Sequence, residues 1–163
     1  MGFRLPRREA GPSIIQGIQG ITFKKVETFM ATKNPAPAAP TSAQAAWVSV
    51  LAKVIDEIES WAKASSWLVS RKEKAISEEH IGTYAAPVLD IKTPGGWVVV
   101  EPIGQEVLGC DGRIDIYTFP TLHRMLLVRQ HGQWVLLTES GIRWPEKWGR
   151  KAFVNLVGDL TAA

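Results

Sequence analysis

The second half of the chain contains five short β-rich runs, and most of the connections between them are only a few residues long. The runs cover residues 88–93, 97–101, 113–119, 122–129 and 134–138. Turn sequences such as Pro-Gly-Gly and His-Gly join neighbouring runs, as in β-hairpins. Parallel strands would need crossover connections of about a dozen residues or more. The sequence therefore predicts a five-stranded antiparallel meander.

The central runs do not alternate between apolar and polar residues. Residues 98–100, 126–128 and 135–137 are each three consecutive Val or Leu residues. A sheet with one solvated face has apolar residues on one side only, so continuous runs indicate that both faces are covered. Two arrangements are compatible with this pattern: one helix on each face, or both helices on one face and a partner on the other.

Helices are expected on both sides of the sheet region in sequence. Residues 41–70 carry an apolar stripe at helical spacing, formed by Trp47, Leu51, Val54, Ile58, Trp61 and Leu68. Thr41 and Gln44 have the spacing of a capping box at its start. Residues 71–80 are charged and predict a helical continuation or a second short helix, and residues 145–160 predict a C-terminal helix that begins at Pro145. The predicted fold class is α+β.

Three segments are expected along the 163 residues. Residues 41–163 form the single α+β domain, and residues 30–40 form a linker rich in Pro and Ala. Residues 1–29 form a leader with two interpretations. It is either an arm that binds a partner through Ile14, Ile15 and Phe23, or it is not natively translated and the protein starts at Met30.

Composition limits the location and the partners. A single cysteine cannot form an internal disulfide and favours a reducing compartment, which predicts a cytoplasmic protein. No run approaches the roughly 20 apolar residues of a membrane-spanning helix, so no membrane association is expected. The net charge of +3 arises in residues 1–40, because residues 41–163 have 13 basic and 14 acidic side chains. A nucleic-acid partner is therefore not expected from the folded part.

One short motif suggests an enzymatic alternative. Asp90-Ile91-Lys92 fits the acidic-x-Lys half of the PD-(D/E)XK nuclease signature, in which a carboxylate binds a divalent metal and the lysine assists the attacking water. Asp115 is a second acidic candidate further along the chain. Neither Asp90 nor Asp115 has the other residues that the full signature requires at the right positions. The alternative function is thus a metal-dependent, nuclease-like enzyme that uses Asp90, Lys92 and Asp115. Its motif is degenerate.

The leading hypothesis is a non-catalytic interaction or assembly module that buries a tryptophan-rich surface. Seven tryptophans favour a protein partner or a homo-oligomer, because Trp is enriched at interface hot spots. Trp144, Trp148 and Arg150 are the expected contact residues, together with Ile14, Ile15 and Phe23 of the leader. The spacing of Cys and His residues matches no zinc signature, and no phosphate-binding loop is present, so no metal or cofactor is expected.

Overall fold

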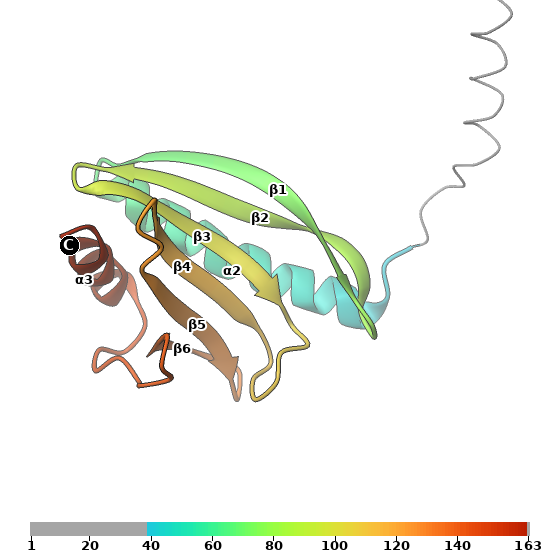
Figure 1. Cartoon of the computed structure of the whole chain (residues 1–163). Helices are drawn as coiled ribbons and strands as arrows, with labels where there is room; N and C mark the ends of the chain where they lie inside the picture. Colours follow the sequence, from blue (N-terminus) through green and yellow to red (C-terminus); the bar gives the residue numbers. More distant parts are fainter. Residues whose placement is uncertain (1–38, 163) are drawn as a thin grey trace, which may run out of the picture. The chain divides into compact units, whose positions relative to one another are not determined.

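The structure, a computed structural model, describes residues 39–162 (Figure 1). The leader and most of the linker lie outside the described residues, so the predictions for Ile14, Ile15 and Phe23 stay predictions. The predicted mixed α+β class with an antiparallel sheet is confirmed. The elements are α2 (Ser42–Ala64), β1 (Leu68–Glu78), β2 (Gly82–Thr93), β3 (Gly96–Gly104), β4 (Arg113–Phe119), β5 (Arg124–Gln130), β6 (Gln133–Thr138) and α3 (Arg150–Thr161).

The sheet has six strands, in the order β1-β2-β3-β4-β5-β6, so the predicted number of five is wrong. The missed strand is β1, whose residues 71–78 were expected to be helical. Its charged side chains suit an edge strand, because charges on an edge hinder pairing with another chain. The same charges are common on a solvated helix, which is why the pattern indicated a helix.

Helix α2 starts at the predicted N-cap but ends six residues earlier than expected. The Thr41 hydroxyl accepts a hydrogen bond from the Gln44 backbone N–H at 3.1 Å. The predicted return contact of the capping box is wrong, because the Gln44 side chain donates instead to the carbonyl of Ile81 at 2.9 Å. At the other end, Ser66 has a φ of 63° and the Trp67 N–H donates to the Ala62 carbonyl, as in a Schellman motif.

Both helices pack on the same face of the sheet. The stripe of α2 is confirmed as core for Trp47, Leu51, Val54 and Ile58, which are almost fully buried. Leu68, also expected in that stripe, begins β1 and is 70% exposed. Helix α3 packs against α2, β3 and β4. Figure 1 looks onto the other face of the sheet, with α2 behind the strands.

Helix α3 is held by a cluster of aromatic side chains. It begins at Arg150 and not at Pro145, because Gly149 is its N-cap. Phe153 is fully buried, and its ring centroid lies 6.1–6.2 Å from those of Trp61, Trp67 and Trp148. These contacts join α3 to the end of α2 and to the residue before β1.

The hairpin of β1 and β2 twists strongly along its length. Its pairing has no register shift, so Lys72, Lys74 and Ile76 lie on one side of the ribbon. Yet Lys72 and Lys74 form ion pairs with Asp90 and Glu101 on the face of the sheet that the helices do not cover. Ile76, in contrast, belongs to the core on the helix side. The far end of the hairpin therefore turns toward the N-terminal end of α2, where Figure 1 shows it extending past the other strands.

Candidate functional site

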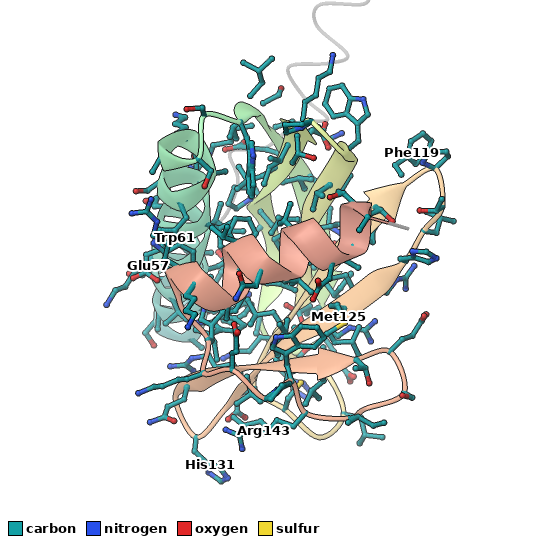
Figure 2. All side chains as sticks on the ribbon, turned by 90° about the vertical axis from the view of Figure 1, so that its left-hand side faces the viewer. Glu57, Trp61, Phe119, Met125, His131 and Arg143 are labelled. Carbon is teal, nitrogen blue, oxygen red and sulfur yellow. The ribbon has the colours of Figure 1, made fainter. Side chains whose placement is uncertain are left out.

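The first candidate surface is the face of the sheet opposite the two helices, here named the open face. Alternation along β3 places Val98 and Val100 in the core, so Trp97, Val99 and Glu101 point to the open face. Figure 2 shows Phe119 on this side, away from Trp61 and Glu57 of α2. Phe119 is 60% exposed, and Trp97, its register partner, is 45% exposed.

A hollow of about 590 Å³ lies in the open face. Three adjacent strands, β2, β3 and β4, supply its apolar surface, and the edge strand β1 adds charged side chains. Its volume falls within the range of small-ligand and side-chain pockets. The residues that line it are Lys72, Glu73, Lys74, Val88, Asp90, Trp97, Val99, Glu101, Tyr117 and Phe119.

Two ion pairs join β1 to β2 and β3 on the open face. Lys72 contacts Asp90 at 2.9 Å, and Lys74 contacts Glu101 at 2.7 Å. The ammonium of Lys92 lies 5.8 Å from the ring centroid of Trp97, within the range of a cation–π interaction. Lys72 and Lys74 are therefore neutralised by carboxylates of the same chain.

Glu101 and Tyr117 form the polar centre of this face. Burial raises the pKa of Glu101, but hydrogen bonds from Lys74 and Tyr117 outweigh it and hold that pKa below its usual value. The Tyr117 hydroxyl donates to Glu101 at 2.8 Å. Burial, followed by this hydrogen bond, raises the pKa of Tyr117 to about 12.

Alkaline titration should reveal these environments directly, because the chain has only two tyrosines. The pKa of Tyr84 is also raised, by burial and then by its hydrogen bond to Glu78. In the unfolded chain, roughly three quarters of the phenols ionise at about pH 10.5, whereas in the folded protein only a small fraction should. Ultraviolet absorbance of phenolate, measured with and without denaturant, checks this expectation.

The raised pKa values of the two tyrosines predict how the free energy of unfolding changes with pH. The neutral phenols favour the folded state, so their contribution is complete below about pH 10 and is lost as pH rises toward about 12 for Tyr117. Tyr117→Phe should remove that titration and leave the one from Tyr84. Equal phenolate absorbance in the folded and unfolded protein at about pH 10.5 would contradict the assigned environments.

The residues of the nuclease alternative all lie on the open face, but on two strands that are not neighbours. Asp90 and Lys92 belong to β2 and Asp115 to β4, with β3 between them. With strands about 4.8 Å apart, the backbones of the two carboxylates are separated by about 10 Å or more. Asp115 is only 3% exposed and accepts hydrogen bonds from both Nε and Nη2 of Arg113. This geometry favours ion pairing within the sheet for both carboxylates.

No group of three His, Cys, Asp or Glu side chains in residues 39–162 is arranged to hold a metal ion. Cys110 is a free, partly exposed thiol in the connection between β3 and β4. No helix in this part of the chain combines the length and apolarity needed to cross a membrane.

The second candidate surface, here named the tryptophan cleft, has a volume of about 780 Å³. It brings together α2, β6 and the segment that leads into α3. Two of the predicted contact residues, Trp144 and Trp148, line it, whereas Arg150, in the first turn of α3, lines a different hollow. Its lining consists of Lys53, Glu57, Gln133, Trp134, Val135, Leu136, Arg143, Trp144, Pro145, Glu146, Lys147 and Trp148.

Sequence reasoning missed the two aromatic residues that dominate the open face. Trp97 lies at the start of the alternating positions of β3 and Phe119 at the end of those of β4. The run of three valines in β3 obscures this alternation in the sequence. Phe119 stands directly before Pro120, a residue typical of turns. Only the register of β3 and β4 shows that Trp97 and Phe119 lie opposite each other.

Comparison with models of known protein families, with curated proteins and with solved structures finds no match for this chain.

Proposed function

We propose that this protein is a non-catalytic assembly module in which two copies associate through their open faces. One observation carries the proposal: both helices lie on one face of the sheet, so Trp97 and Phe119 stay exposed side by side on the other. Aromatic side chains that cluster on a surface are typical of protein interfaces. The cytoplasmic location expected from the single cysteine belongs to the same proposal.

The dimensions of the open face suit a dimer. Six strands at about 4.8 Å spacing and about seven residues at about 3.3 Å rise give roughly 650 Å² in projection. A stable interface buries about 800 Å² on each partner. Two such sheets can pack face to face as in a β-sandwich, with their strands inclined by about 30°.

The arrangement of shape and charge supports a second copy as the partner. A twofold interface uses the same patch on both molecules, so the patch must complement itself. The open face carries both the protruding ring of Phe119 and the adjacent hollow, which a ring from the other copy can enter. Lys72–Asp90 and Lys74–Glu101 are already paired, so these four groups need no opposite charge from a partner.

The test is the mass of the full chain in solution across a wide dilution series, measured by light scattering or sedimentation equilibrium. We expect a monomer–dimer equilibrium for the wild type. Phe119→Asp should weaken dimerisation by at least about tenfold, because it places a charge in the centre of an apolar contact. Circular dichroism checks that the variant stays folded.

Leu108→Asp is the matched control, because Leu108 is fully exposed in the connection between β3 and β4. This variant should dimerise like the wild type. A wild type that is monomeric at every concentration refutes self-association, and so does an equal loss of dimer in both variants.

A further inference from the structure

We infer that the tryptophan cleft is a second binding site, which takes an acidic segment of a partner protein with an apolar side chain next to its carboxylates. The cleft lies between α2, β6 and the segment before α3, not on the open face between β1 and β4. The inference therefore does not depend on the proposed dimer.

Backbone hydrogen bonds fix the aromatic wall of the cleft. After β6 the chain turns back, and the Trp144 N–H donates to the Leu136 carbonyl at 2.8 Å. Trp148 is held from the other side by an edge-to-face contact with Trp61, at a centroid distance of 5.7 Å. Trp134 packs against Trp47 at 6.4 Å. A wall that is already ordered costs little side-chain entropy when a ligand binds.

The cations of the cleft differ from Lys72 and Lys74 of the open face, which are paired with carboxylates. Within residues 39–162, no carboxylate lies in ion-pair range of Lys53, Arg143 or Lys147. Arg150 and Lys151, in the first turn of α3, line a separate, smaller hollow and do not belong to the cleft. The three cations of the cleft exceed its two carboxylates, Glu57 and Glu146, and lie beside three tryptophans. This lining complements a ligand that is both anionic and apolar.

Two carboxylates in the cleft favour a protein segment over a nucleic acid. Glu57 and Glu146 line the same surface, and Glu146 accepts a hydrogen bond from the Asn155 side chain at 2.9 Å. They would repel the successive phosphates of a strand that runs through the cleft. A peptide can instead place its few carboxylates at the cations and an apolar side chain against the indoles. Moreover, residues 41–163 have no excess of basic side chains to follow a phosphate backbone.

The test is selection from a library of random dodecapeptides displayed on phage, with the full-length protein as the target. We expect the selected peptides to be enriched in Asp and Glu next to an aromatic or aliphatic residue. Arg143→Gln combined with Lys147→Gln should lower their affinity by at least about tenfold, and added salt should weaken binding further. Trp144→Ala should also weaken binding, because its ring forms part of the wall.

Lys72→Gln combined with Lys74→Gln is the matched control, since it removes two cations of the open face. It should leave the affinity of the selected peptides unchanged. Three outcomes would overturn the inference: no acidic enrichment, equal loss of affinity in both double variants, or tighter binding of oligodeoxythymidylate than of any selected peptide. Because Phe119→Asp disrupts only the dimer, peptide binding by that variant separates failure of this site from failure of the open face.

Discussion

Replacing Phe153 with alanine is expected to lower the free energy of unfolding by about 3–5 kcal/mol, the usual cost of truncating a buried phenylalanine. The side chain is fully buried, and tryptophan rings approach it from α2, from the residue before β1 and from the segment before α3. The cavity would thus remove contacts that hold α3 in place. Urea denaturation followed by circular dichroism measures the loss.

Val154→Ala is the matched control, because it changes the next residue of the same helix and only part of that side chain is buried. Its cost should be about 1 kcal/mol or less. If the two variants unfold at the same urea concentration, the aromatic cluster does not anchor α3.

Gly112→Ala should destabilise the protein by at least about 2 kcal/mol for two separate reasons. Gly112 has a φ of +151°, a conformation that residues with a side chain rarely adopt. A Cβ at this position would also lie 2.5 Å from the nearest atom of the Trp47 ring, which is buried and hydrogen-bonded to Tyr84. The ring cannot retreat without breaking that contact. The change in the urea midpoint is the measurement.

A second glycine separates strain from steric conflict. Gly132 has a φ of +76°, but nothing lies within 4 Å of the position of its Cβ. Gly132→Ala should therefore show the cost of strain alone, about 1 kcal/mol. Combining Gly112→Ala with Trp47→Leu should cost less than the sum of the two single changes, because the smaller side chain relieves the conflict. Strict additivity would show that Gly112 and Trp47 do not interact.

Local patterns were sufficient to predict most of the fold. The start of α2 follows from Thr41, whose hydroxyl accepts a hydrogen bond from the otherwise unpaired backbone N–H of Gln44. All five predicted β runs lie largely within β2 to β6, and the meander follows from their short connections. Strand β1 could not be predicted in this way, because its edge position, which explains its charges, is a property of the whole sheet. The end of α2 depends on Ser66 in a left-handed conformation, which glycine adopts far more readily.

The candidate surfaces were only partly predictable. Trp144 and Trp148 were identified from composition and charge, but the contributions of Lys53 and Trp134 to their cleft come from elements distant in sequence. The open face could not be identified at all, because the sequence left both arrangements of the helices possible. Which face each helix covers is decided by packing across the whole domain.

The strand order has a consequence for how the chain reaches this structure. Every strand pairs only with its neighbours in sequence, so each new strand extends the sheet through a short loop. The entropy lost in closing such loops is small, and topologies dominated by local pairing fold faster than those with long-range pairing. Helix α2 precedes every strand, so during synthesis its apolar stripe emerges before the surface that buries it.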